Sequence, residues 1–575
     1  MNIMSWLWDI QGGATLGVIW AIMALGLYLT YRVLNYADLT VDGSLTLGGA
    51  VSAVCVAAGV SPILAILIAT ISGMAAGSVT GFLHTKFKIP DLLAGILTQF
   101  ALYSINLRIM GKANFGLLNE VTLFSQIKAL GIPSKWAGLL VGVVFAVVLI
   151  IAVYCFFGTE IGCALRATGN NPHMVRAMGA NTKVYIVLGL IVGNGLVAMS
   201  GALLAQYQGY ADINMGVGTI VIGLAAIMIG EVLFSKKTYF HRLAGVVIGS
   251  VVYRIIIAFV LRISLTADTV IKITADDMKL ITAIIVVIAL VAPNLKDSAL
   301  AKLSGKEGDL MLDIKHVYKT FNKGTPVQKE ALIDLNLHLD EGDFVTIIGG
   351  NGAGKSTMLN AVAGVFELDK GHITIDGNDV TKDPEYKRAK YIGRVFQDPL
   401  RGTAGDMWIE ENLAFALRRG KNRSFKWGIS NKEREQFVEL LKTLDLGLED
   451  SLDSKVGLLS GGQRQALTLL MATIKKPQLL LLDEHTAALD PKTAKTVLEM
   501  TNKVVTENHL TTLMVTHNMN DAIKYGNRLI MMDHGHVILD ISGEEKKNLK
   551  VPDLLAKFEE VSGKEFSNDR MMLAK

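Results

Sequence analysis

The first 300 residues consist largely of long apolar runs separated by short polar segments. These runs lie near residues 13–34, 44–60, 62–84, 91–110, 136–157, 183–205, 215–234, 242–261 and 279–294. A helix needs about 20 apolar residues to cross a bilayer, so the pattern predicts an α-helical membrane domain of about nine spans. Basic residues are concentrated in alternate loops, at 86–88, 166–183 and 236–242, which predicts that those loops are cytoplasmic. Nine spans then place the C-terminal part of the chain in the cytoplasm.

From about Leu312 the pattern changes to short apolar strands that alternate with helices, which predicts an α/β domain. The charge pattern changes as well. The first 300 residues contain 18 Lys and Arg and 12 Asp and Glu, whereas the remaining residues contain 38 and 40. The sequence shows no basic face of the kind that would indicate a nucleic-acid partner. We therefore divide the chain into a membrane domain at 1–295, a linker at 296–311, an α/β domain at 312–545 and a C-terminal helical tail at 546–575.

The strongest motif of the second part follows Phe344–Ile348, which reads as a buried strand. The next residues fit the pattern G-x-x-x-x-G-K-[ST]. A glycine-rich loop between a strand and a helix lets backbone N–H groups surround phosphate oxygens. The motif predicts a nucleotide-binding loop that includes Gly349, Asn351, Gly352, Ala353, Gly354, Lys355, Ser356 and Thr357.

A second apolar strand, Leu479–Leu482, ends in Asp483 and Glu484. We expect Ser356 and Asp483 to hold Mg²⁺, Asp483 through water, because this ion prefers oxygen ligands. Glu484 would orient and deprotonate the water that attacks the phosphate. A lone Asp-Glu pair is more often structural, but its order and spacing after the phosphate-binding loop favour ATP hydrolysis.

The phosphate-binding loop together with the later run Leu459–Gln463 (L-S-G-G-Q) resembles the ATPases of ABC transporters. The resemblance implies further roles. Gln397 would sense Mg²⁺ and contact the membrane domain. Phe321 would stack on adenine, with Tyr318 as the rival, and His517 would contact the γ-phosphate.

In this family the L-S-G-G-Q run is called the signature motif. One chain has one phosphate-binding loop and one signature motif, and the two face apart. The resemblance therefore implies a homodimer with two ATP sites across a two-fold interface. Ser460, Gly461, Gly462 and Gln463 would cap the ATP of the other copy, and Asp490 would form the D-loop. Two positions depart from the family pattern. His485 replaces the usual proline and Ala487 the usual serine or glycine, so we expect altered loop packing with hydrolysis retained.

Two segments of the membrane part are rich in polar residues. The stretch Asn35–Ser44 reads either as a short cytoplasmic loop or as a broken helix that lines the pathway. The loop Gly158–Thr182 reads as a coupling helix that docks on the ATPase, with a plain surface loop as the alternative. Polar residues inside spans, such as Asn194 and Arg254, are expected mainly to link helices; Arg254 is the best candidate for a functional charge.

The membrane part resembles the branched-chain amino acid permeases in the run Gly17–Leu34, in the residues that follow it and in Gly48-Gly49-Ala50. Ala37–Ser44 is similar to permeases of tryptophan or tyrosine importers. The resemblance implies a bacterial plasma-membrane importer with a type II-like fold, an amino acid-like solute and a separate extracellular or lipoprotein binding protein. An exporter of lipid or drug-like solutes is the alternative, and a membrane-anchored ATPase that signals or transmits force is a third. The exact solute does not follow from the residues.

Overall fold

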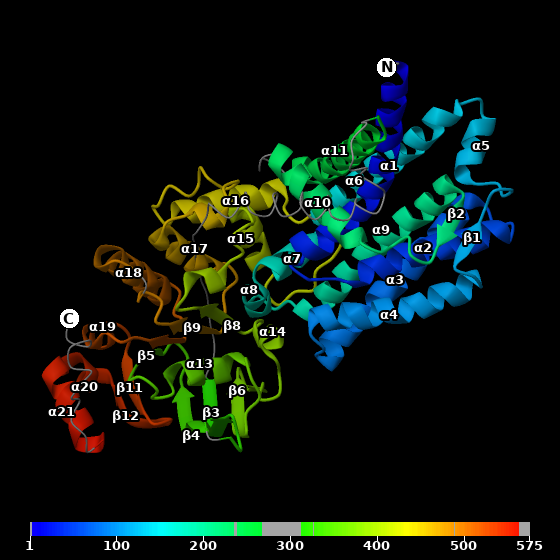
Figure 1. Ribbon diagram of the computed structural model, residues 1–575. Coiled ribbons are helices and arrows are strands. Elements are labelled where there is room, and N and C mark those ends of the chain that lie inside the picture. Colours follow the sequence, from blue (N-terminus) through cyan, green and yellow to red (C-terminus); the bar gives the residue numbers. More distant parts are fainter. Residues whose placement is uncertain (1–2, 235–238, 267–311, 326, 488, 563–575) are drawn as a thin grey trace. The chain divides into compact units, whose positions relative to one another are not determined.

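The structure is a computed structural model, and it describes every residue except 1–2, 235–238, 267–311, 326, 488 and 563–575 (Figure 1). The chain forms two compact units. The first comprises Met1–Gly169 and Lys183–Asp297, and the second comprises Asn170–Thr182 and Ser298–Lys575. The expected linker at 296–311 and the expected span at 279–294 lie outside the described residues.

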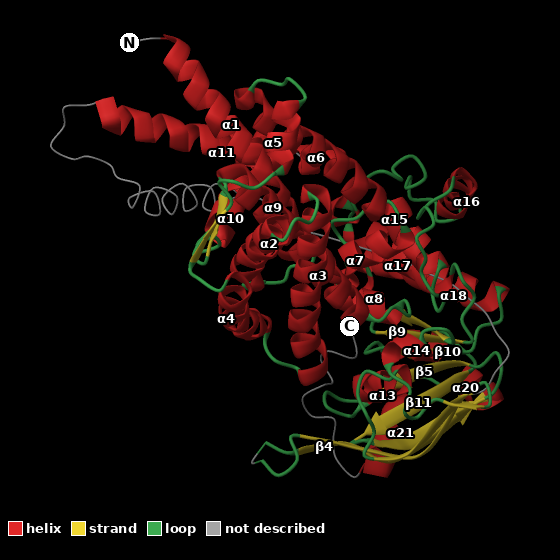
Figure 2. Ribbon diagram, turned by 90° about the vertical axis from the view of Figure 1, so that its right-hand side faces the viewer, coloured by secondary structure: helices red, strands yellow, loops and turns green. Residues whose placement is uncertain are grey.

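The first unit is almost wholly helical, with one short antiparallel ladder between β1 and β2 (Figure 2). Its elements are α1 (Ile3–Leu27), a π-helix (Tyr28–Val33), α2 (Thr40–Ala57), α3 (Pro62–Phe87), α4 (Asp91–Met110), β1 (Asn114–Gly116), α5 (Leu123–Ala129), α6 (Ser134–Phe157), α7 (Glu160–Asn170), α9 (Thr182–Gln208), β2 (Tyr210–Asp212), α10 (Thr219–Leu233) and α11 (Tyr239–Thr266).

Seven described helices are long and apolar enough to cross a membrane. They are Trp8–Val33, Thr40–Ala57, Pro62–Phe87, Asp91–Met110, Ser134–Phe157, Thr182–Gln208 and Tyr239–Phe259. The expected span at 215–234 is the shorter apolar helix α10, because the residues before Thr219 form a turn rather than a helix. The described residues therefore account for eight of the nine apolar runs, one of them with a short helix.

The outward faces of several of these helices are apolar. Exposed side chains on α3, α4 and α6 include Ile63, Leu67, Ile71, Leu93, Leu97, Phe100, Val144, Val148 and Ile151. Apolar surfaces of this extent fit contact with lipid rather than with water. Inside the unit, helices approach closely at glycine: a Cβ on Gly48 of α2 would lie 1.9 Å from the carbonyl oxygen of Ala198 in α9. Small residues permit such close packing in membranes.

The second unit contains the short helix α8 (Pro172–Ala177) and the α/β domain. The strands are β3 (Leu312–Phe321), β4 (Lys329–Leu339), β5 (Phe344–Ile348), β6 (Lys370–Ile375), β7 (Asn378–Asp379), β8 (Ile392–Val395), β9 (Leu479–Asp483), β10 (Thr512–Val515), β11 (Arg528–Asp533) and β12 (His536–Ser542). The helices are α13 (Lys355–Ala363), α14 (Glu385–Arg388), α15 (Ile409–Leu417), α16 (Asn431–Lys442), α17 (Gly461–Thr473), α18 (Pro491–Glu507), α19 (Met519–Lys524), α20 (Gly543–Asn548) and α21 (Val551–Ser562), with 3-10 turns at Pro399–Gly402 and Val456–Leu458.

Two sheets form the framework of the α/β domain. One has the strand order β12-β11-β5-β10-β9-β8, with all neighbours parallel except β12, and the other is the antiparallel sheet β4-β3-β6-β7. Apolar residues of the antiparallel sheet, part of those of the larger sheet and those of α13 share one buried core. The chain thus has the predicted fold class, a helical membrane domain followed by an α/β domain.

Candidate nucleotide-binding site

Four parallel strands bring the candidate catalytic residues to one edge of the larger sheet. In the register, Val515 of β10 lies opposite both Ile347 of β5 and Asp483 of β9, and Val395 of β8 lies opposite Leu482. The carboxyl ends of these strands therefore meet, and ligands of open α/β sheets bind at such an edge. The residues that follow the four strands are the phosphate-binding loop, Glu484, His517 and Gln397.

The phosphate-binding loop joins β5 to α13 and requires glycine at two positions. Gly349 has a φ of +149° and Gly354 a φ of +101°, both in the region that favours glycine. A Cβ on Gly349 would lie 2.2 Å from the Met532 carbonyl oxygen, and one on Gly354 would lie 2.7 Å from that of Ala331. The loop can therefore lie close to the neighbouring backbone while the N-terminus of α13 is left to face an anion.

Lys355 and Ser356 begin α13. Lys355 is buried, and its Nζ donates to the carbonyl oxygen of Gly349 at 2.7 Å and to that of Gly350 at 3.2 Å. Ser356 Oγ donates to Asp483 Oδ1 at 3.1 Å. This hydroxyl–carboxylate pair has the oxygen chemistry that suits Mg²⁺. Burial raises the pKa of Asp483, and the positive charge of Arg394 opposes that rise.

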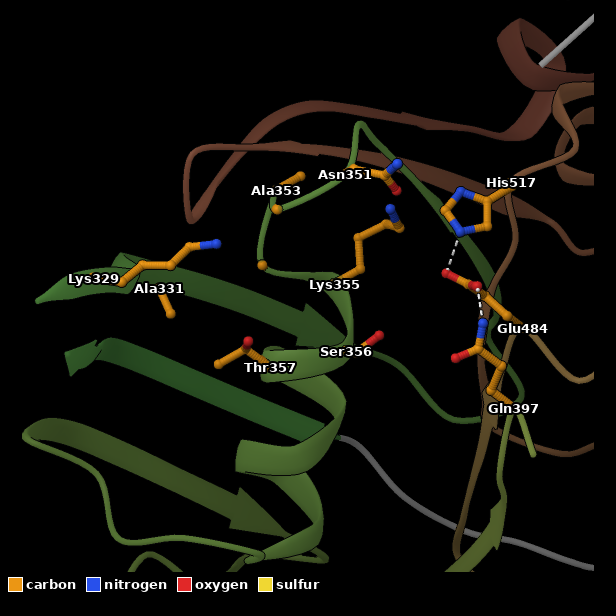
Figure 3. A pocket seen from close by; sticks show the side chains of 12 residues that line it. Lys329, Ala331, Asn351, Ala353, Lys355, Ser356, Thr357, Gln397, Glu484 and His517 are labelled. Atoms are coloured by element: carbon orange, nitrogen blue, oxygen red, sulfur yellow. Dashed lines mark hydrogen bonds and ion pairs between the residues drawn. The ribbon is translucent and has the colours of Figure 1, made fainter. Parts of the chain in front are cut away.

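Glu484 lies between Gln397 and His517 (Figure 3). Gln397 Nε2 donates to Glu484 Oε2 at 2.8 Å, and His517 Nε2 lies 2.6 Å from Glu484 Oε1. The backbone of Glu484 has a φ of +44°, an uncommon value for a residue other than glycine. Residues in such conformations are concentrated at functional sites, where the surrounding structure holds them. The two partners fix the direction of the carboxylate.

These residues line a pocket of about 300 Å³. Its lining residues are Lys329, Ala331, Asn351, Gly352, Ala353, Gly354, Lys355, Ser356, Thr357, Gln397, Glu484 and His517 (Figure 3). The pocket brings the phosphate-binding loop together with the candidate catalytic residues Gln397, Glu484 and His517.

Comparisons with known proteins match both parts of the chain. The family model of the branched-chain amino acid transport system permease component matches residues 10–291, and the ABC transporter model matches residues 332–487. The tyrosine transport ATP-binding protein of Clostridioides difficile (strain R20291) is 47% identical over 43% of this chain and 99% of its own length. The tyrosine transport system permease protein of the same organism is 39% identical over 49% of this chain and 91% of its own length.

The chain belongs to the ABC transporter family. It joins a permease and an ATP-binding domain in one polypeptide. A solved dimeric ATP-binding cassette in a post-hydrolysis state with ADP and Pi is 31% identical and covers 40% of this chain and 98% of its own, with a TM-score of 0.36. The transporter is a multi-pass membrane protein with a cytoplasmic ATPase domain, and this domain couples ATP hydrolysis to transport.

Three of the nucleotide contacts expected from the sequence lie outside this pocket: Phe321, the signature motif and Asp490. Phe321 ends β3, pairs in register with the pocket residue Lys329, and packs edge-on against Phe366 at 5.3 Å between ring centroids. The signature motif begins α17, where Ser460 Oγ accepts from Gln463 N at 3.3 Å. Asp490 caps α18 by accepting from Thr493 N at 3.1 Å.

Lys329 is a pocket residue that the sequence analysis missed. It begins β4, is exposed, and directs its side chain toward the phosphate-binding loop (Figure 3). A Cβ on Gly352 would lie 3.4 Å from Lys329 Nζ. No local motif marks this lysine, because pairing of β4 with β3 brings it to the loop. Its positive charge suits a phosphate group.

His485, which departs from the family pattern, is buried beside the turn that holds Glu484. Its Nε2 lies 3.1 Å from Thr501 Oγ1 of α18, and both side chains are buried. A proline at this position could not form that contact, so altered loop packing stays the expectation.

The polar stretch after α1 is a buried break between two helices. The π-helix ends at Val33 and α2 begins at Thr40. Between them Asp38 is 3% exposed, and its carboxylate accepts from Asn194 Nδ2 at 2.7 Å and from Thr40 N at 3.0 Å. Ser44 Oγ donates to Asn194 Oδ1 at 2.6 Å. The broken-helix interpretation therefore fits better than an exposed loop.

Two other polar residues of the permease also have defined partners. Asp42 accepts from the backbone N–H groups of Gly218 and Ile220 at 3.1 and 3.2 Å, at the N-terminus of α10. A carboxylate at this end of a helix interacts favourably with the helix dipole. The Arg254 guanidinium lies 4.2 Å from the centre of the Trp20 ring, so it packs as a cation on an aromatic face.

The loop that the sequence analysis read as a coupling helix contains α8, which belongs to the same compact unit as the ATPase domain. Asn171 caps α8 by accepting from His173 N and Met174 N, both at 3.1 Å. Its Nδ2 donates to the carbonyl oxygens of Leu400 and Thr403 at 2.6 and 2.7 Å. Asn171 thus caps α8 and binds the ATPase surface at once.

Proposed function

We propose that this transporter is an ATP-driven importer of an aromatic amino acid-like solute, with tyrosine favoured and tryptophan next. The observation that carries the proposal is the agreement of the two halves. The permease half and the ATPase half resemble the permease and the ATP-binding protein of one tyrosine transport system. An external binding protein on a separate chain would deliver the solute, as in importers of this family.

The residues of the pocket support a mechanism for hydrolysis. The loop N–H groups and Lys355 would bind the phosphates, and Glu484 would accept a proton from the attacking water. Gln397 and His517 hold the Glu484 carboxylate in one direction, which reduces the reorganisation needed for proton transfer. Ser356, Asp483 and Gln397 would hold Mg²⁺, which would neutralise developing phosphate charge.

A homodimer is part of the proposal. The pocket of one chain contains the phosphate-binding loop but none of Ser460, Gly461, Gly462 or Gln463. Ser460 is exposed, and Gly461, Gly462 and Gln463 are partly exposed at the start of α17. Because these residues are accessible to a second copy, two chains would complete two equivalent sites. Asp490 would also contact the partner, through the D-loop.

Reconstitution tests the direction and the solute together. The full chain is placed in proteoliposomes with its cognate binding protein outside, and uptake of labelled tyrosine and tryptophan is measured with ATP inside. Uptake that requires ATP and is absent in Glu484→Gln supports import. ATPase activity that the binding protein stimulates without uptake of either amino acid would reject the aromatic solute. Release of solute driven by ATP would reject import.

A further inference from the structure

The second unit contains a chain of charged groups, two of them buried, that runs from α8 to the start of the ATP site. Arg176 of α8 donates through Nε to Glu385 Oε2 at 3.4 Å, and Arg394 of β8 donates through a terminal nitrogen to Glu385 Oε1 at 3.4 Å. The side chain of Arg176 is 32% exposed, whereas those of Glu385 and Arg394 are 10% and 6% exposed. The carboxylate of Glu385 thus bridges two arginines.

The low exposure of Glu385 and Arg394 makes their interaction strong, because water and salt screen buried charges weakly. Burial raises the pKa of Glu385, and the charges of Arg394 and Arg176 oppose this rise. Each arginine therefore stabilises the ionised carboxylate. Loss of the contact with Arg176 would change the charge balance around Arg394 as well.

Arg394 connects this pair to the phosphate-binding loop. Its second terminal nitrogen donates to Asn360 Oδ1 in α13, the helix that begins at Lys355. Its guanidinium also lies 4.5 Å from the centre of the Phe396 ring. Gln397, which holds Glu484, is the next residue after Phe396. Arg394 therefore contacts both the phosphate-binding helix and the segment that leads to the hydrolytic carboxylate.

We propose that Arg176, Glu385 and Arg394 form a relay through which the position of α8 sets the position of α13 and Gln397. Glu385 and Arg394 are then positioning residues for ATP hydrolysis. The inference rests on the proposed coupling of solute import to hydrolysis, because α8 is joined through α7 and α9 to the permease. A contact of 3.4 Å is lost after a small shift of α8, so the relay responds to displacements well below one helical turn.

Two other contacts, at the two ends of α8, are made to backbone groups. Arg423 donates to the carbonyl oxygens of Met178 and Gly179 at 3.1 and 3.4 Å. Asn171 likewise binds carbonyl oxygens. These contacts fix where α8 lies on the ATPase surface. In the described part of the chain, Arg176 begins the side-chain route from α8 to Asn360.

ATP hydrolysis by the full chain in lipid nanodiscs, without any solute, tests the relay. We expect Arg176→Gln and Glu385→Gln each to lower kcat about threefold to tenfold, while KM for ATP changes less than about twofold. The double variant should be no slower than Glu385→Gln alone, because both changes break one relay. Arg176→Lys keeps the charge and should recover most of the activity.

Two controls separate the relay from simple docking or misfolding. Lys387→Gln removes an exposed charge from α14, the helix that contains Glu385. Lys387 pairs with Asp383 at 3.4 Å, and its replacement should leave kcat unchanged. Arg423→Gln weakens docking of α8, so its effect should multiply with that of Glu385→Gln. If Glu385→Gln does not fold, judged by its melting temperature, the comparison of Arg176→Gln with Arg176→Lys still decides.

Three results would overturn the relay. The first is unchanged kinetics in Arg176→Gln and Glu385→Gln, and the second is independent, multiplying effects of these two variants. The third is a loss in Arg423→Gln that equals the loss in Arg176→Gln and is equally non-additive with Glu385→Gln. Because no solute is present, this outcome is separate from the question of what is transported. Failure of tyrosine uptake would reject the proposed solute and leave the relay intact. Unchanged kinetics in the relay variants would reject the relay and leave import intact.

Discussion

His517 Nε2 lies 2.6 Å from Glu484 Oε1, although 32 residues separate the two along the chain. Glu484 directly follows β9, and His517 comes shortly after β10. These two parallel strands are neighbours in the sheet. The pairing of these strands, rather than a local motif, creates the contact. In the proposed mechanism, this histidine holds the carboxylate ready to accept a proton from water.

Glu484→Gln should abolish turnover and keep nucleotide binding. The amide has the same shape and retains a hydrogen-bonding oxygen, but it cannot accept the proton of the attacking water. We expect kcat to fall by about 10² or more and the Kd for ATP to change less than about threefold. Phosphate release and equilibrium ATP binding measure the two effects. Glu499→Gln, an exposed change on α18, is the matched control. Near-normal hydrolysis in Glu484→Gln would remove Glu484 from the role of base.

Lys355→Ala should weaken ATP binding, because it removes a buried positive charge from the phosphate-binding loop. A charge-assisted contact of about 1.5–3 kcal/mol corresponds to a loss of about tenfold to 100-fold in affinity. Lys329→Ala is the natural comparison, since Lys329 lines the same pocket from an exposed position. Its loss should be smaller. Equal affinities of Lys355→Ala and the unaltered transporter would contradict the assignment of the phosphate site.

His485→Ala should slow hydrolysis without abolishing it. The change removes the contact with Thr501 and leaves a cavity beside Glu484, whose φ of +44° depends on its surroundings. We expect the free energy of unfolding to fall by about 1–3 kcal/mol and kcat to fall severalfold. Thr501→Val removes the same hydrogen bond with little change in volume. If Thr501→Val left kcat unchanged while His485→Ala lowered it, packing rather than the bond would hold the turn.

Asp38→Asn should impair transport more than hydrolysis. Both carboxylate oxygens of Asp38 accept from donors, Thr40 N and Asn194 Nδ2, so an amide nitrogen in this place faces a donor. A buried donor without an acceptor costs about 1–3 kcal/mol and would disturb the break between the π-helix and α2. We expect a large loss of ATP-dependent tyrosine uptake with basal ATPase activity close to that of the unaltered chain.

The control for this variant is Asp212→Asn, in the short ladder between β1 and β2, where Asp212 accepts from Asn114 at 3.2 Å at an exposed position. It should transport normally. Full uptake by Asp38→Asn would show that the buried carboxylate is dispensable and would remove the helix break from the transport mechanism.

The membrane part shows where hydropathy alone was sufficient and where it was not. Long apolar runs such as 62–84 and 136–157 became helices with nearly the same bounds, because a helix that satisfies its own backbone is the only simple way to bury such a run in lipid. The run at 215–234 became the shorter helix α10. Its first residues form a turn, and the carboxylate of Asp42 accepts from the backbone where the helix begins. The average hydropathy of a segment cannot reveal a partner that is distant in sequence.

The sequence by itself determined the phosphate-binding loop, the strand that ends in Asp483 and Glu484, the signature motif and the membrane character of the first part. Each of these depends on neighbouring residues, whose local geometry follows from residue type. Tertiary structure alone decided that Lys329 reaches the loop, that Asn194 binds Asp38, and that Glu385 joins Arg176 to Arg394. The physical reason is that strand pairing and helix packing bring together residues that no spacing along the chain relates.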